Sequence, residues 1–264
     1  MGLWLFQLPV LAMGAIIIGL IYLGTAIIYW AVTALAKKDR LRVAFKAISP
    51  GMLPPISVVF ALLVGFMAAQ VWSDAEKANT AVNTEASALR DAMLISTAFP
   101  DSEHRMKALI RSYIEDAVSQ EWPAMAKQNA TLTLAPQRLS EALRLALSLQ
   151  ATTPGQLDAQ RELVSALKTA LDYRRQRIIL SSSRVNWVKW TVLLAQAAVM
   201  LVAIAMVHCD NQLANKIILT IFATSVGVAV VLVAAHARPF TGQISVHPTY
   251  LLQVMPEADA KAVP

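Results

Sequence analysis

The chain has 264 residues, of which 56% are hydrophobic and 15% are charged, and its formal net charge is +6. Soluble globular proteins carry roughly 25% charged and roughly 45–50% apolar residues, so this composition favours an integral membrane protein. The high apolar content also excludes a disordered chain. A disulfide-built secreted domain is excluded because the single cysteine, Cys209, cannot form an intramolecular disulfide.

Four apolar runs predict four transmembrane helices. The first is Val10–Leu35, in a charge-free N-terminal stretch, and the others are 47–73, 190–207 and 217–235. Each is close to or above the roughly 18 to 20 apolar residues that cross a hydrocarbon core of roughly 30 Å. Five of the six tryptophans flank these runs, as in an interfacial aromatic belt: Trp4, Trp30, Trp72, Trp187 and Trp190.

The short loop between the first two runs carries most of the net charge. Residues 37–46 contain five Lys or Arg residues against Asp39, so the loop carries +4. Such a loop determines topology, and it can also bind anionic lipid headgroups; both interpretations remain open. We therefore expect the lipid bilayer to be a partner, and the basic composition gives no support to nucleic-acid binding.

The orientation in the membrane has two readings. The charge-free N-terminus and the basic first loop place that loop in the cytoplasm, because the first helix usually dominates. The long polar insert, 73–186, is then extracytoplasmic, and we prefer this orientation. Five arginines near the third and fourth runs favour a cytoplasmic insert instead: Arg174, Arg175, Arg177, Arg184 and Arg238.

The insert is predicted to be helical, because Gly155 is its only glycine and its β-branched runs are short. The second membrane helix continues without a breaker to Ser96, and Asp101 or Ser102 caps the next helix. Trp122–Pro123 interrupts or kinks that helix.

The second half of the insert carries further helix signals. Pro136 begins a short helix, and Thr153–Gln156 forms a capping box with proline at the first helical position. No breaker then precedes the third membrane run. We therefore predict that the second and third membrane helices extend as long stalks, with two shorter helices between them and Trp122 anchoring their core.

Signatures of catalysis are missing from the sequence. The four histidines show no metal-ligand spacing, and there is no phosphate-binding glycine-rich loop, nucleophile elbow or HExxH motif. We therefore expect no enzyme, no cofactor and no metal site. The transmembrane runs lack Asp, Glu, Lys and Arg, which disfavours a proton-coupled transporter.

Large apolar residues recur on one face of the second membrane helix. Val58, Leu62 and Phe66 are spaced i, i+4, i+8. In an oligomer such residues can form rings around an axis, and an apolar constriction of this kind gates by dewetting. A stripe facing lipid or the core of the bundle has the same spacing, so the pattern alone does not decide between a pore neck and ordinary packing.

Three stretches of the chain resemble the bacterial bestrophin-like integral membrane family of unassigned function. They are Gly65-Phe66 through Glu85-Ala86, Glu121-Trp122-Pro123-Ala124-Met125, and Arg238-Pro239-Phe240-Thr241-Gly242 followed by Val246 and Pro248. With the four-span layout they cover nearly the whole chain. The family often has an acidic residue before Arg-Pro-Phe, where this chain has His236-Ala237.

The resemblance implies a distant likeness to bestrophins, which are pentameric anion channels with an apolar neck on the second transmembrane helix. It places Val58, Leu62 and Phe66 at the neck positions. Bestrophins keep their large middle region in the cytoplasm, which opposes the orientation favoured by charge. The motif residues are expected to be structural: Glu121, Trp122, Pro123, Arg238, Pro239, Phe240 and Gly242.

We thus predict an all-α membrane protein of the bacterial inner membrane, with four transmembrane helices and a helical extramembrane insert between the second and third. The predicted parts are 1–72, 73–186, 187–240 and a tail, 241–264. The leading function is a homo-oligomeric ion channel for small ions, pentameric by analogy with bestrophins. The alternative is a non-conducting sensor, scaffold or assembly partner that acts through its insert.

Overall fold

The computed structural model describes residues 6, 8–132, 136–183 and 186–257 of the chain. All regular secondary structure in these residues is helical, which confirms the all-α class. The chain forms two compact units: a membrane unit of residues 1–73, 184–238 and 242–244, and an insert unit of residues 74–183, 239–241 and 245–264. The long helix α4, Leu53–Ser96, contributes to both.

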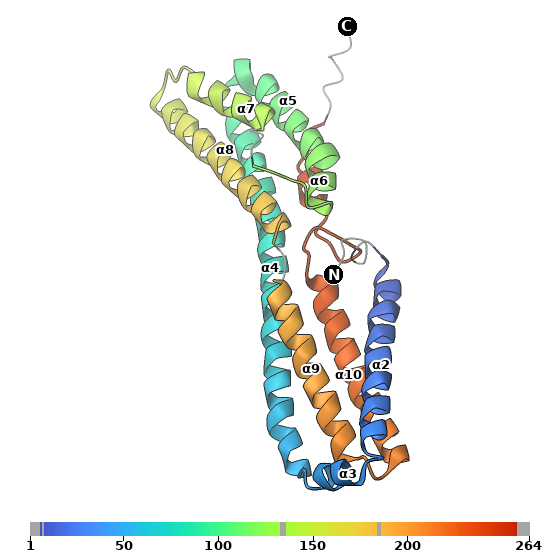
Figure 1. Ribbon diagram of the computed structural model, residues 1–264. Coiled ribbons are helices and arrows are strands. Elements are labelled where there is room, and N and C mark those ends of the chain that lie inside the picture. The colour runs from blue at the N-terminus through green and yellow to red at the C-terminus, as the bar shows by residue number, and fades with distance from the viewer. Residues whose placement is uncertain (1–5, 7, 133–135, 184–185, 258–264) are drawn as a thin grey trace. The chain divides into compact units, whose positions relative to one another are not determined.

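The membrane unit contains the four predicted spans. They are α2 (Val10–Leu35), the first part of α4, α9 (Trp187–Val207) and α10 (Gln212–His236), and all four are long and apolar enough to cross a membrane. The basic loop forms a short helix, α3 (Asp39–Lys46), at the end of the unit where α2 ends and α4 begins (Figure 1). The predicted belt residue Trp4 lies outside the described residues.

Small residues let α2 and α10 approach closely. A Cβ atom on Gly227 would lie 3.1 Å from the side chain of Ile18, so the glycine accommodates that neighbour. The Tyr22 hydroxyl and the Thr224 hydroxyl form a hydrogen bond of 2.7 Å across the same interface. The polar and small residues of α10 on this face are therefore used within the protomer.

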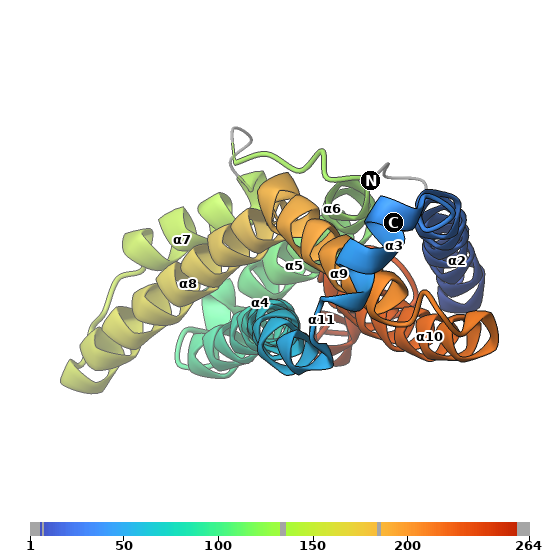
Figure 2. The ribbon, with the colours of Figure 1, turned by 60° about the horizontal axis from the view of Figure 1, so that its bottom comes forward.

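The insert unit is built from the second part of α4 and the further helices that pack with it. These further helices are α5 (Pro100–Asp116), η2 (Ala117–Glu121), α6 (Trp122–Ala126), α7 (Gln137–Ser148), α8 (Pro154–Ser181) and α11 (Thr249–Gln253). Figures 1 and 2 both show α7 alongside α8. Fully buried aliphatic and aromatic side chains from α4, α5, α7 and α8 form one core, which also includes Leu251 of the C-terminal segment.

Two predicted helix boundaries are wrong. Helix α8 ends at Ser181, and α9 is a separate helix whose cap residue, Asn186, accepts a hydrogen bond from the Val188 amide at 3.1 Å. The third membrane helix is therefore not a continuous stalk, although α4 is continuous as predicted. Helix α5 begins at Pro100, so neither Asp101 nor Ser102 is its cap, because proline occupies the first helical turn.

The capping box of α8 is confirmed in a modified form. The Thr153 hydroxyl accepts a hydrogen bond from the Gln156 amide at 3.2 Å. The Gln156 side chain returns to the backbone amide of Thr152, 2.9 Å away, one residue earlier than in the standard box.

Candidate functional site

The candidate neck residues lie on an exposed face of α4. Val58, Leu62 and Phe66 are 57%, 55% and 71% exposed in the protomer. The core of the membrane unit lies on another face of the helix, which buries Phe60, Met67 and Val71. The stripe is therefore not part of the bundle core of the protomer, which leaves an environment of lipid, a second subunit or a pore.

The insert unit contains a buried network of charged side chains. Arg177 of α8 and Glu85 of α4 form an ion pair of 2.8 Å, and neither side chain is exposed. Arg177 also donates to Glu121 Oε2 at 2.8 Å, and Arg174 donates twice to Glu121 Oε1, at 2.8 and 2.5 Å. The Tyr113 hydroxyl donates to Glu85. Two carboxylates and two guanidinium groups thus balance each other and join α4, α8 and η2.

Burial and charge act against each other in this network. Burial favours the neutral form of Arg177, but the charge and hydrogen bond of Glu85, together with Tyr113 and Glu121, outweigh it and raise the pKa of the guanidinium above its ordinary value. Burial, followed by the negative charge of Glu85, raises the pKa of the Tyr113 phenol well above its ordinary value. At neutral pH the Arg177 guanidinium is therefore charged and the Tyr113 phenol is neutral.

Trp122 links the two motifs that carry the resemblance. Its ring lies 4.5 Å from the Arg177 guanidinium and packs edge-on against Phe240, with centroids 6.1 Å apart. Its indole Nε1 donates to the Val246 carbonyl at 3.1 Å. Pro239 adds a backbone bond, since its carbonyl accepts from the Val246 amide at 2.8 Å. These contacts hold the C-terminal segment in the core of the insert unit.

Pro123 follows a change in helix type. It lacks an N–H group, so the α-helical bond to the Ser119 carbonyl cannot form. The preceding residues, Ala117–Glu121, are π-helical. The predicted interruption is therefore a widened helical turn, and it carries Glu121.

Arg238 and Gly242 lie in the membrane unit. The Arg238 guanidinium is 4.2 Å from the centroid of the Phe6 ring. Gly242 has φ +95°, and a Cβ atom there would lie 2.9 Å from the Phe6 carbonyl oxygen. The bend at Thr241–Gly242 therefore requires glycine for both conformation and space.

The comparisons with known proteins agree with these motifs. A family model described as the bestrophin-like domain matches residues 19–251. The chain belongs to the bestrophin-like family. No curated protein matches the chain by sequence.

Solved structures share the bestrophin fold. A mutant of a bacterial bestrophin homolog from Klebsiella pneumoniae has a TM-score of 0.71 and 12% identity, over 90% of this chain and 97% of that one. A second mutant structure of a Klebsiella pneumoniae bestrophin homolog has a TM-score of 0.67 and 13% identity, over 90% and 94%. A structure described as a membrane protein has a TM-score of 0.64 and 12% identity, over 89% of this chain and 94% of that one. At such identities the likeness establishes the fold alone.

Sequence reasoning misplaced two arginines of this bestrophin-like protein. Arg174 and Arg177 were counted among the basic residues that favour a cytoplasmic insert, but both are buried in ion pairs of the insert unit. Arg238 is also buried, Arg175 is exposed, and Arg184 lies outside the described residues. Glu85 was named only as part of a family stretch, and its ion pair with Arg177 was not predicted.

The described residues contain no group of three or more His, Cys, Asp or Glu side chains arranged to hold a metal ion. Cys209 is a free, half-buried thiol in the part of the chain that the structure describes.

Proposed function

We propose that the protein forms an ion channel as a symmetric homo-oligomer in the bacterial inner membrane, with Val58, Leu62 and Phe66 of α4 surrounding the axis as a neck. The observation that carries this proposal is the exposure of all three side chains on one face of a membrane helix in a bestrophin fold. A ring of large apolar side chains controls conduction because a narrow apolar passage readily loses its water.

The surfaces beside the neck support a ring of subunits. Residues one position before and after a helical residue lie about 100° to either side of it. Before Leu62 and Phe66 come Ala61 and Gly65, which are exposed. The small residues allow another helix to approach closely on this side.

The opposite side of the neck has a different shape. A groove of about 250 Å³ lies there, and Phe66 itself lines one part of it. The rest is lined by apolar side chains of α4 and α9, among them Leu63, Met67, Val192 and Leu193, and by the polar side chains of Gln70 and Lys189. Two different surfaces on either side of a common face suit a head-to-tail contact, which closes into a ring when the rotation fits. A pentamer follows by analogy with bestrophins.

The proposed orientation in the membrane rests on the distribution of charge. We place the first loop in the cytoplasm and the insert outside it, since Lys37, Lys38 and Arg40 of the loop are exposed. The buried arginines Arg174 and Arg177 are neutralised by carboxylates, so they do not form a basic surface on the insert.

Ion flux from liposomes tests the neck. Phe66→Ala is expected to raise flux several-fold, because it widens the constriction and shortens its apolar length. Leu20→Ala is the matched control, since Leu20 is an exposed apolar residue of α2, 60% accessible, away from α4. Equal flux in the wild type and both variants contradicts the neck. A stable monomer in nanodiscs contradicts the channel and favours a non-conducting sensor or scaffold.

A further inference from the structure

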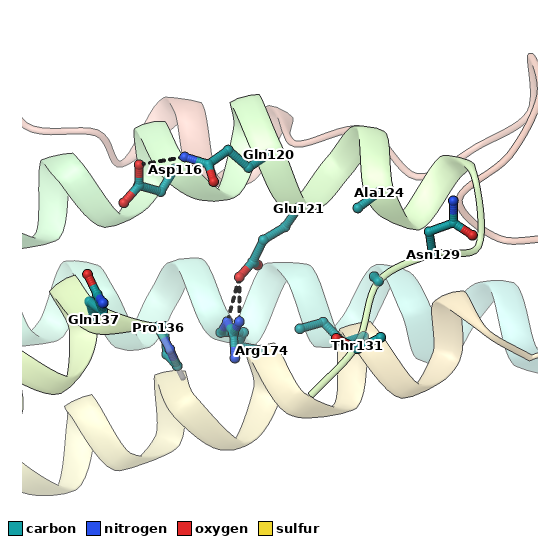
Figure 3. Close-up of a pocket in the computed structure, with 11 residues that line it drawn as sticks. Asp116, Gln120, Glu121, Ala124, Asn129, Thr131, Pro136, Gln137 and Arg174 are labelled. Carbon is teal, nitrogen blue, oxygen red and sulfur yellow. Dashed lines mark hydrogen bonds and ion pairs between the residues drawn. The ribbon is translucent and has the colours of Figure 1, made fainter. Parts of the chain in front are cut away.

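The insert unit contains a surface cavity, lined by polar and apolar side chains, beside the buried charge network. Its volume is about 360 Å³, within the range of about 300–1,000 Å³ typical of small-molecule sites. Its wall is formed by the end of α5, the π-helical turn η2, α6, residues 129–131, the start of α7 with the proline before it, and α8. Figure 3 shows side chains from these elements surrounding the same space.

An ion pair forms part of the cavity wall. Arg174 lines it with a side chain that is 8% exposed, and Glu121 lines it at 19%. Figure 3 shows the two side chains pointing toward each other. Glu121 is held from behind by Arg177, so the orientation of its carboxylate is determined by two guanidinium groups. A site whose polar groups are fixed before the ligand arrives loses little freedom on binding.

The remaining walls combine amide groups with small apolar side chains. Gln120, Asn129 and Gln137 offer both hydrogen-bond donors and acceptors, and Ala124 and Ala130 leave room between them. The π-helical turn lies in this wall, and such turns occur frequently at functional sites. A ligand with hydrogen-bonding groups along its length suits this lining.

The charge of the lining selects among polar ligands. Arg174 and Glu121 neutralise each other, and Arg177 behind them is neutralised by Glu85. Asp116 adds a further negative charge. Among the described residues its carboxylate accepts from the Gln120 amide at 3.2 Å and has no cationic partner within ion-pairing distance. The cavity therefore has a net charge of −1 and accommodates a ligand with one positive charge.

We propose that this cavity binds a small polar molecule that carries a single ammonium group, which Asp116 receives, and hydrogen-bonding groups, which the amides receive. An anion is disfavoured because Glu121 already occupies the Arg174 guanidinium and Asp116 repels negative charge. All of its lining residues belong to the insert unit, so the site shares no residue with the proposed neck.

Binding of three probes of similar size to the full-length protein in nanodiscs tests the site. Alaninamide is cationic, lactamide is neutral and malonamate is anionic, and ligand-observed NMR measures all three at equal ionic strength. Alaninamide is expected to bind roughly tenfold more tightly than the other two, which is the ratio that one ion-pair or charge-assisted hydrogen bond provides.

Two variants test separately the charge of Asp116 and the space inside the cavity. Asp116→Asn is expected to abolish the preference for alaninamide, and Ala124→Leu, which fills the cavity, to abolish binding of all three probes. Asp158→Asn on α8 is the matched control, because Asp158 is exposed and outside the lining, and it should bind like the wild type. The proposal is overturned if no probe binds, if malonamate binds as tightly as alaninamide, or if Asp158→Asn weakens binding as much as Asp116→Asn.

Discussion

Arg177 and Glu85 are separated by 92 positions in the chain, and their side chains form an ion pair from which solvent is fully excluded. The pair joins α8 to α4, the helix that begins with the candidate neck. Burying a charge without a partner costs several kcal/mol, so each residue makes the burial of the other possible. The stability of the insert unit should therefore depend on both.

Arg177→Met is expected to destabilise the protein by about 3–5 kcal/mol, because Glu85 remains buried without its main partner. Thermal unfolding in detergent, followed by circular dichroism, measures the loss. The matched control is Arg161→Met, since Arg161 lies on the same helix with its side chain 71% exposed. The Arg177→Met/Glu85→Gln double variant should recover part of the loss. Equal unfolding temperatures for Arg177→Met and the control contradict this role.

Tyr113 should make the protein less stable at high pH. Its pKa in the folded protein is raised, so the stability it supports is fully present below its unfolded pKa of about 10 and is lost as the pH rises toward the folded value. The free energy of unfolding should therefore fall more slowly above about pH 10 in Tyr113→Phe than in the wild type. Tyr250→Phe, at an exposed position, is the control. If the free energy of unfolding falls with pH at the same rate in all three proteins, Tyr113 does not destabilise the protein at high pH.

Gly242 should not tolerate a side chain. Gly242→Ala forces a Cβ atom to within 2.9 Å of the Phe6 carbonyl at a backbone angle that disfavours alanine, and we expect a loss of about 1–3 kcal/mol. Gly155→Ala is the matched control, because nothing lies within 4 Å of its Cβ position and the residue is in a helix. That substitution should be neutral or stabilising. A smaller loss for Gly242→Ala than for Gly155→Ala contradicts the steric account.

The orientation is accessible to labelling on intact cells. In a Cys209→Ser background, Gln150→Cys in the insert should react with a membrane-impermeant thiol reagent. Lys38→Cys in the first loop should react only after permeabilisation; both positions are exposed. The reverse pattern places the insert in the cytoplasm.

Much of the membrane unit could be predicted from sequence, because a membrane span depends on a local run of apolar residues. The continuity of α4 also follows from a local feature, the absence of a breaker up to Ser96. The separation of α8 from α9 does not. Ser181 and Ser182 bond their hydroxyls to carbonyls of their own helix, and serine in a sequence is only a weak signal of an ending.

The buried charge network could not be predicted, because its members are distant in sequence. Arg174 and Arg177 near a membrane helix are compatible with a lipid interface or with a buried ion pair, and only the position of Glu85 and Glu121 decides between them. The neck residues were predicted from their i, i+4, i+8 spacing and from the family resemblance. Their exposure in the protomer depends on which face of α4 packs against the other helices, which the spacing leaves open.

Modification of a cysteine in the neck tests the central proposal most directly. Leu62→Cys in a Cys209→Ser background is reconstituted in liposomes, and ion flux is measured before and after a cationic methanethiosulfonate reagent, with labelling verified by mass spectrometry. If Leu62 lines a pore, the attached charge should change flux strongly and a reducing agent should restore it, while Leu20→Cys on α2 responds to neither treatment. Unchanged flux after complete labelling of Leu62→Cys would contradict a neck on α4.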